Sequence, residues 1–413
     1  MTNDDIIRAA LKAWGRELYK TTSLTLVARE LGVSKPALYR HFKDKQALLD
    51  AMYQSFFENY VIPFKKVHDT ALKVSSLRER LFILMRSITE FYLQNNDFFL
   101  FSLIQVYGCK KMHEIFGHLE ARGIDMKTLF GEIRGFAGKK SVPYPSKVRL
   151  VLVTSIFWVA HFHCYGYKGV KPGEALVKKM VAFIEAKVAR GLSLKEAQVK
   201  NLDYEALEKI ASQTVYADTE DNKLLMAVAE AVAEAGPWNA SMEMVARKSG
   251  LSKSGLYSHF KSRQDMLGRL FITEFNKIID YSEQSARASK IPEEQLYLAI
   301  ISIVEYLRSR PEILVALNWI KTRRLDLGVE VPQTIYRAIT GIKLKVIKED
   351  GAKGVYNAQW ILFMVVSVLT HWTPKSIAQP PVGGGGLHIA KVPNESFRIL
   401  FKFITCGLEG FNL

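Results

Sequence analysis

Two short stretches of the chain carry the same set of cationic and hydrogen-bonding side chains at the same spacing. Residues 27–49 read VARELGVSKPALYRHFKDKQALL and residues 245–267 read VARKSGLSKSGLYSHFKSRQDML. They align without a gap at an offset of 218 residues, and 13 of the 23 positions are identical. Lys, Tyr and His side chains donate hydrogen bonds to phosphate oxygens, and such contacts fix the register of a protein on a duplex. The repeated residue types therefore indicate contacts with a nucleic-acid backbone.

The elements that position these side chains are two helices joined by a short turn. Ser23 can cap a first helix, Gly32 supplies the left-handed residue that ends it, and Ser34 caps a second helix. A turn as short as Gly-Val-Ser holds the helices at the steep angle that lets the second one enter a major groove. The apolar residues of the first helix recur at helical spacing: Leu24, Val27, Ala28 and Leu31.

The second helix is expected to place Leu38 and Phe42 inward and its polar face outward. Pro36 suits the first turn of a helix, where no amide proton is needed. An isolated G-x-S between amphipathic helices is also typical of an ordinary helical hairpin. Core packing explains the repeated Leu, Phe and Gly positions, but it gives no reason for Lys, Tyr and His to match on the opposite face. The repeat therefore favours DNA binding over a plain hairpin.

With GVSKPALYRHFKDKQALLDAM in the first copy, both copies resemble the DNA-binding domain of the TetR/AcrR-type transcriptional regulators. The resemblance covers roughly 50 residues per copy, and the rest of the chain resembles this family only in length and helical character. The residues that we expect to contact DNA are Ser23, Thr25, Ser34, Lys35, Pro36, Ala37, Tyr39, Arg40, His41 and Lys45 in the first copy, and Ser241, Ser252, Lys253, Ser254, Tyr257, Ser258, His259 and Arg263 in the second.

Composition is consistent with a folded cytoplasmic protein of more than one domain. The chain has 413 residues, of which 48% are hydrophobic, enough for sizeable cores. Its three cysteines, Cys109, Cys164 and Cys406, are far apart and suit free thiols. No secretory signal is expected in the acidic, amphipathic N-terminus, and no apolar run reaches the roughly 20 residues that span a bilayer.

The net charge of +16 invites a polyanionic partner, but it does not single out the repeated motifs. Most of the excess lies in residues 53–200, which hold 23 basic and 12 acidic side chains. The expectation of DNA binding therefore depends on the motifs and not on the charge.

Helical periodicity runs along nearly the whole chain, which predicts an all-α fold. The sequence predicts five segments: a first helix-turn-helix domain (residues 1–52), a helical body (53–192), a linker with one helix (193–220), a second helix-turn-helix domain (221–271) and a second body (272–413). In each copy an amphipathic helix before the motif closes a three-helix core. The helix after the first motif is expected to end at about Pro63.

The resemblance implies that the body helices form a small-molecule pocket and that the last two helices pair with those of a second subunit. Because both sets occur in one chain, it implies an intramolecular pseudo-dimer; pairing of each half with another chain is the alternative. Aromatic residues of the first body are candidates for an effector pocket, although ordinary core packing would also explain them: Phe91, Phe99, Trp158, His161 and Phe162.

No pattern for a cofactor or a catalytic site accompanies these features. His161 and His163 fall on different faces of a helix, which argues against a metal site, and the Gly383–Gly386 run lacks the context of a phosphate loop. The predicted function is a non-enzymatic transcriptional regulator, a repressor released by a small molecule, whose two unlike heads read an asymmetric operator. The alternative is a ligand- or partner-binding protein whose second head no longer binds DNA, since Gly255 weakens that recognition helix by up to ~1 kcal/mol.

Overall fold

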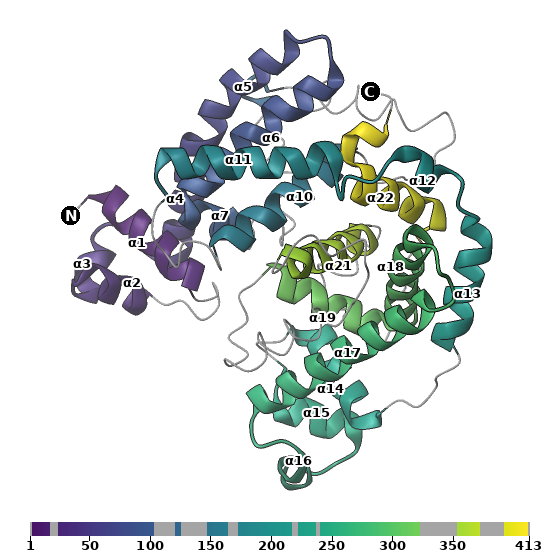
Figure 1. Cartoon of the computed structure of the whole chain (residues 1–413). Helices are drawn as coiled ribbons and strands as arrows, with labels where there is room; N and C mark the ends of the chain where they lie inside the picture. Colours follow the sequence, from purple (N-terminus) through teal and green to yellow (C-terminus); the bar gives the residue numbers. More distant parts are fainter. Residues whose placement is uncertain are drawn as a thin grey trace. The chain divides into compact units, whose positions relative to one another are not determined.

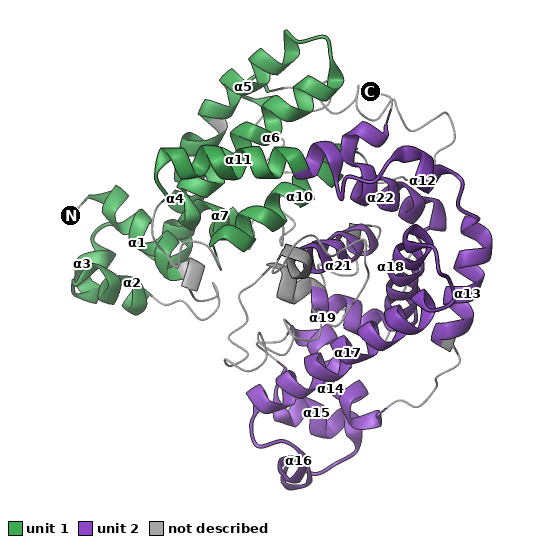
Figure 2. Ribbon diagram, in the orientation of Figure 1, with its two compact units in different colours: residues 1–140, 146–186, 413 green, residues 141–145, 187–412 purple. Residues whose placement is uncertain are grey.

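The computed structural model describes residues 2–16, 24–102, 120–124, 147–163, 172–216, 222–236, 240–322, 353–371 and 392–411 (Figure 1). Within these ranges every regular element is a helix, which confirms the predicted all-α class. The chain forms two compact units (Figure 2). Residues 1–140, 146–186 and 413 belong to unit 1, and residues 141–145 and 187–412 belong to unit 2.

Unit 1 contains the first head and the first body. Its helices, of which the last extends past residue 186, are α1 (Asn3–Arg16), α2 (Leu24–Leu31), α3 (Lys35–Tyr39), α4 (Lys45–Phe56), α5 (Ile62–Leu72), α6 (Leu77–Gln94), α7 (Asn96–Phe101), α10 (Lys147–His161) and α11 (Glu174–Arg190). Helix α6 packs against both α5 and α10. The sequence also predicts helices at residues 110–121 and 127–136, which lie wholly or mostly outside the described residues.

The helix after the first motif does not end near Pro63, contrary to the expectation from sequence. Helix α4 continues through a π-helical segment, Phe57–Val61, directly into α5, which ends at Leu72. Pro63 lies in the first turn of α5. A proline disrupts the hydrogen-bond ladder of an α-helix, and a short π-helical turn is one way in which a helix absorbs such an interruption without stopping.

Unit 2 contains the second head and the second body. Its helices are α12 (Glu196–Lys200), α13 (Tyr204–Tyr216), α14 (Lys223–Ala235), α15 (Met242–Ser249), α16 (Lys253–His259), α17 (Arg263–Ala286), α18 (Pro292–Ser309), α19 (Pro311–Thr322), α21 (Lys353–His371) and α22 (Asn394–Cys406). The sequence also predicts a helix at residues 332–348 and a loop at residues 373–392, which fall almost entirely outside the described residues.

The segment between the halves contains two helices, and the longer one, α13, packs along α18 and α17 of the second body. Glu208 of α13 accepts hydrogen bonds from the Arg398 guanidinium (2.8 Å), the Tyr297 hydroxyl (2.6 Å) and the Asn394 amide (2.9 Å). Burial disfavours the ionised form of Glu208, but these hydrogen bonds outweigh it and lower the pKa of the carboxyl. The segment is therefore anchored to the second body along much of its length.

The chain that leaves α11 crosses the last turn of α22 with its backbone. The Leu192 amide donates to the Ile404 carbonyl (2.8 Å), and the Leu194 amide donates to the Thr405 carbonyl (3.0 Å). The last carbonyl groups of a helix have no partner within the helix. Residues of the first half thus satisfy carbonyl groups at the end of the second half.

Two glycines make this crossing sterically allowed. Gly191 and Gly407, which follow the last helices of the two halves, both have positive φ, 56° and 62°. A Cβ atom on Gly191 would lie 2.2 Å from the Ile404 carbonyl oxygen, and one on Gly407 would lie 2.4 Å from the Ala189 carbonyl oxygen. Only glycine fits both the backbone conformation and the space.

Candidate nucleic-acid interface

The first head is built on a small buried core. Helices α1 and α2 pack together, α1 also packs on α4, and Leu38 of α3 is buried between its neighbours with 1% of its surface exposed. Gly32 ends α2 with φ 66°, and the Val33 amide donates to the Ala28 carbonyl (3.0 Å). This pair of features is a helix-ending motif that needs a left-handed residue. The predicted role of Gly32 is confirmed.

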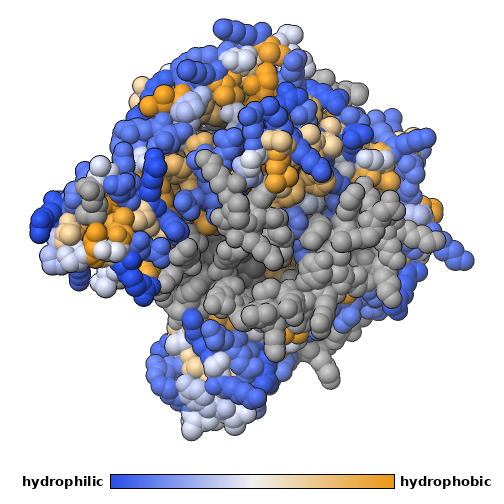
Figure 3. Space-filling model, turned by 60° about the vertical axis from the view of Figure 1, so that its left-hand side comes forward, coloured by the Kyte–Doolittle hydropathy of each residue, from blue (hydrophilic) through white to orange (hydrophobic). Residues whose placement is uncertain are grey.

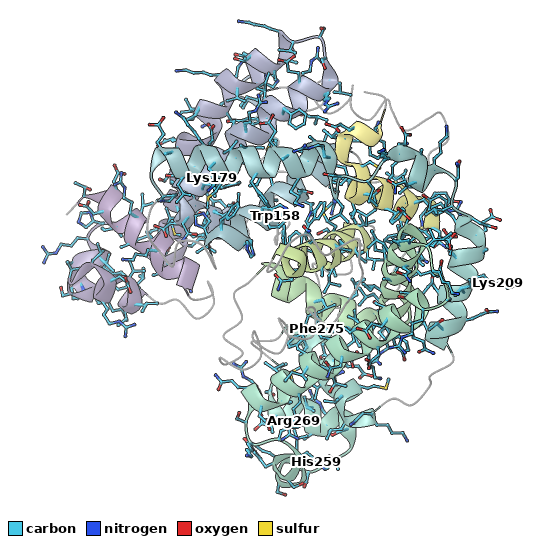
Figure 4. All side chains as sticks on the ribbon, viewed as in Figure 1. Trp158, Lys179, Lys209, His259, Arg269 and Phe275 are labelled. Atoms are coloured by element: carbon cyan, nitrogen blue, oxygen red, sulfur yellow. The ribbon has the colours of Figure 1, made fainter. Side chains whose placement is uncertain are left out.

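The second head repeats this construction. Gly250 ends α15 with φ 71°, the Leu251 amide donates to the Ala246 carbonyl (3.0 Å), and Leu256 of α16 is fully buried. Helix α17 follows α16 directly and leads into the second body, and Figure 4 shows His259, Arg269 and Phe275 in that order along this path. One continuous helix thus connects the second head to the second body.

The predicted DNA-facing residues that the structure describes lie on the outer side of both heads. Tyr39 and Tyr257 are 46% and 49% exposed, unusually high values for tyrosine. The second head, at the bottom of Figure 3, is mainly hydrophilic on the face in view. The other exposed members of the set are Thr25, Ser34, Lys35, Pro36, Arg40, His41, Ser252, Lys253, Ser254, Ser258 and His259, while Ala37, Lys45, Ser241 and Arg263 are half-buried. Ser23 lies outside the described residues.

The two recognition helices begin differently. The Ser252 hydroxyl accepts from the Gly255 amide (3.0 Å) and so caps α16. Ser34 has the extended backbone of a capping residue, but its side chain makes no capping hydrogen bond. Ser34 therefore occupies the predicted N-cap position, but its hydroxyl does not make the predicted capping hydrogen bond. With Pro36 in the first turn, α3 has one fewer amide that needs a cap, so the bond is less necessary there.

Hydroxyl groups at the second recognition helix form hydrogen bonds with other groups of the same head. The Ser258 hydroxyl donates to the Gly255 carbonyl (2.6 Å), and the Ser252 and Ser254 hydroxyls lie 3.0 Å apart. In the first head, Nδ1 of His41 lies 2.8 Å from Oδ1 of Asn3, at the start of α1. Such local bonds fix the side chains before they meet a ligand, which reduces the entropy lost on binding.

Sequence reasoning missed two residues beside this face. Asn3 was not singled out, and neither was Glu243, whose carboxylate pairs with Lys253. The 218-residue offset aligns Glu243 with the neutral Thr25. A position-by-position comparison of the two copies therefore shows an acidic residue in the second head where the first head has none. No local pattern pointed to Asn3.

The helix that follows each recognition helix begins with a basic residue, Lys45 or Arg263. The amide groups at these two helix starts are already capped: Asp44 accepts from Ala47 (2.7 Å), and Ser262 accepts from Asp265 (3.1 Å). Partial burial lowers the pKa of Lys45. A phosphate at either position would therefore meet a cation beside a capped helix start.

The candidate effector residues form two aromatic groups in the first body. Phe91 of α6 and Phe99 of α7 both contact Tyr92, while His161, Phe162 and Phe183 surround Trp158 of α10. His163 contacts the first group: its ring lies 5.6 Å from Phe99, and its Nε2 lies 2.8 Å from the Tyr92 carbonyl. The indole NH of Trp158 is buried and has no hydrogen-bond partner. The five predicted residues are thus gathered in one region of unit 1.

Substitution of His161 should change the pH dependence of stability. Burial lowers the pKa of His161 to about 4, from 6.5 in an exposed histidine. The unfolded chain therefore binds this proton first, and unfolding becomes easier as the pH falls below 6.5. Between pH 7 and 5 we expect His161→Phe to lose less free energy of unfolding than the wild type, by up to ~2 kcal/mol. Urea denaturation at both pH values measures this difference, and parallel losses in the two proteins would contradict it.

Two further kinds of feature were predicted to be absent, a membrane-spanning helix and a metal site, and neither is found among the described residues. Among these residues no helix is both long and apolar enough to cross a bilayer. The same residues contain no group of three or more His, Cys, Asp and Glu side chains placed to hold a metal ion.

Comparison with known proteins supports the assignment of the two heads. Residues 6–52 and 224–270 each match the model of the family described as bacterial regulatory proteins, tetR family. A similar solved structure is the TetR family transcriptional regulator PfmR from Thermus thermophilus (19% identity, 45% of this chain and 97% of that chain covered, TM-score 0.33). The matched segments coincide with the helix-turn-helix heads described above, α1–α4 and α14–α17. The chain therefore contains two domains that match the tetR family of bacterial regulatory proteins, one in each half.

Proposed function

We propose that this DNA-binding regulator places both of its heads on one duplex and acts as a non-enzymatic repressor. The observation that carries the proposal is the occurrence, within one chain, of two complete helix-turn-helix heads whose exposed faces share a Lys, a Tyr and a His. Phosphate contacts from these residue types fix orientation, and two linked heads bind more tightly than either alone because the second contact becomes intramolecular.

The proposal includes pairing of the two halves within the chain. Support comes from the backbone crossing at Gly191 and Gly407, in which the residues after the last helix of the first half bond to the last helix of the second half. In a homodimer the corresponding contact would join two chains. Here it joins positions some 210 residues apart in one chain, which favours the pseudo-dimer over pairing between chains.

We further propose that a small molecule bound in a body opposes DNA binding. Helix α17 runs from the second head into the second body, so a ligand that moves the body alters the position of the head. A ligand that stabilises the protein against heat should weaken its DNA binding. The proposal fails if such ligands leave DNA affinity unchanged.

A second candidate function is ligand or partner binding with an inactive second head. Two observations favour it: Gly255 lowers the helix propensity of α16, and Lys253 is paired with Glu243. In this case only the first head would require a specific sequence.

The preferred operator is expected to be asymmetric. Identical heads read a palindrome, but here the groove-facing positions differ: Pro36 is replaced by Ser254, Ala37 by Gly255 and Arg40 by Ser258. Ala37 offers a methyl group to thymine, whereas Gly255 offers no side chain. The half-sites should share some base pairs and differ in others, with centres about one helical turn, or a small multiple, apart.

Selection from random duplexes with the full chain tests this proposal. We expect a bipartite site with two related but unequal half-sites, both protected in a footprint. A perfect inverted repeat would contradict the use of unlike heads. A single half-site would support the second candidate function, and failure to enrich any sequence would contradict DNA reading altogether.

A further inference from the structure

The second head contains an internal ion pair that connects its two motif helices. Nζ of Lys253, the first residue of the recognition helix α16, lies 2.5 Å from Oε1 of Glu243, in the first turn of α15. The hydrogen bond raises the pKa of the Lys253 ammonium and lowers the pKa of the Glu243 carboxyl. Both groups are therefore charged at neutral pH. The pair lies between the two parts of the head that would approach DNA.

The first head differs at this point. The position equivalent to Glu243 is Thr25, which carries no charge, and the position equivalent to Lys253 is Lys35. Nζ of Lys35 lies over the ring of Tyr39, 5.8 Å from its centre. This arrangement leaves the full positive charge of Lys35 available to a phosphate, because a tyrosine ring does not neutralise it.

A carboxylate beside the recognition lysine competes directly with DNA. The side chains of Lys253 and Glu243 are 57% and 69% exposed, so both remain in water until a duplex approaches. An exposed ion pair of this kind contributes little to stability, so a phosphate group can displace it. The carboxylate still stays near the phosphate oxygens and repels them. Fewer counterions are then released from the DNA than a free lysine would release.

We propose that Glu243 acts as an internal substitute for phosphate and makes the second head the weaker of the two. This proposal rests on the proposed function, because it assumes that both heads meet DNA. Glu243 would then make the DNA affinity of the second head lower than that of the first. The first head would anchor the chain, and the second head would bind only where its half-site has a favourable sequence and lies at the right distance. Glu243 is a specificity-determining residue in this scheme although no DNA contact by its carboxylate is required.

A purely structural role for Glu243 predicts a different outcome. An acidic residue in the first turn of a helix is stabilised by the helix dipole. Loss of that effect would lower the thermal stability of the head but would not increase the salt dependence of DNA binding. The dependence of the binding constant on salt therefore separates the two roles.

The test is a reciprocal exchange in the full chain, Glu243→Thr and Thr25→Glu, with DNA affinity measured between about 50 and 200 mM salt on the selected duplex. We expect Glu243→Thr to tighten binding by about 3- to 10-fold and to steepen the plot of log K against log salt by about one unit. Thr25→Glu should weaken binding and flatten the plot by similar amounts. Glu243→Gln, which keeps the side-chain length, should reproduce the tightening if Glu243→Thr proves unstable.

Glu234→Gln is the matched control for net charge. Glu234 also belongs to the second head, but it pairs with Lys248 (2.9 Å) rather than with a residue of the recognition helix. An effect of Glu243→Thr no larger than that of Glu234→Gln, or an unchanged salt slope, would overturn the inference while the proposed function stands. A wild-type chain that binds no selected duplex would overturn both.

Discussion

Replacement of Gly407 by alanine should lower the free energy of unfolding by about 3 kcal/mol or more. Gly407 has φ 62° and ψ −153°, a backbone region that only glycine occupies readily, and its added Cβ would lie 2.4 Å from the Ala189 carbonyl. Both penalties act at once, because relief of the clash requires the crossing of the two halves to open. Gly191→Ala should be similarly destabilising, since its Cβ would meet the Ile404 carbonyl at 2.2 Å.

Gly173→Ala is the control for this pair. Gly173 precedes α11, its φ is not positive, and a Cβ atom there would meet no atom within 4 Å. Urea denaturation of the three variants should therefore show large losses at Gly407 and Gly191 and a much smaller one at Gly173, where only the N-cap preference of α11 is affected. Equal midpoints for all three would mean that the crossing of the halves does not contribute to the folded state.

Loss of the shared Lys and Tyr should affect the two heads unequally. We expect Lys35→Ala with Tyr39→Ala to weaken DNA binding about 100-fold, because two hydrogen bonds to charged phosphate are removed. Lys253→Ala with Tyr257→Ala should weaken it only about 10-fold, since Lys253 already shares its charge with Glu243. Each double variant should also flatten the salt dependence, by up to about one unit per lost contact.

Two exposed lysines of the bodies and linker provide controls for charge alone. Lys179 lies on α11 and Lys209 on α13, outside both heads (Figure 4). Substitution of either by alanine should change affinity far less than the head variants. Equal losses from both heads would contradict the proposed ranking, and no loss from either would show that these faces do not contact DNA.

Local patterns predicted the heads well. The spacing of Leu38 and Phe42 and the positions of Gly32 and Gly250 all follow from the chemistry of two short helices joined by a tight turn, and the structure confirms them. The predicted all-α class also holds for both bodies wherever they are described, because apolar residues at helical spacing leave few alternatives.

Contacts between distant parts of the chain could not be predicted. The hydrogen bonds that join Leu192 to Ile404 and Glu208 to Arg398 connect segments about 200 residues apart. The spacing of apolar residues along the sequence predicts helices but does not indicate which distant helices pair. The prediction that this helix ends near Pro63 is wrong for another reason: proline often ends a helix, but here a π-helical segment accommodates it. The ion pair between Glu243 and Lys253 could not be predicted either, because it depends on how α15 and α16 pack against each other.

The most direct test of the two-headed, single-chain reader is the mass of its complex with the selected duplex. Native mass spectrometry or sedimentation of the full chain on that duplex measures the number of chains bound, while a footprint reports how many half-sites are protected. We expect one 46.8 kDa chain per duplex with both half-sites protected. Two chains on the same two half-sites would show that each chain contributes one head, and would contradict the built-in dimer.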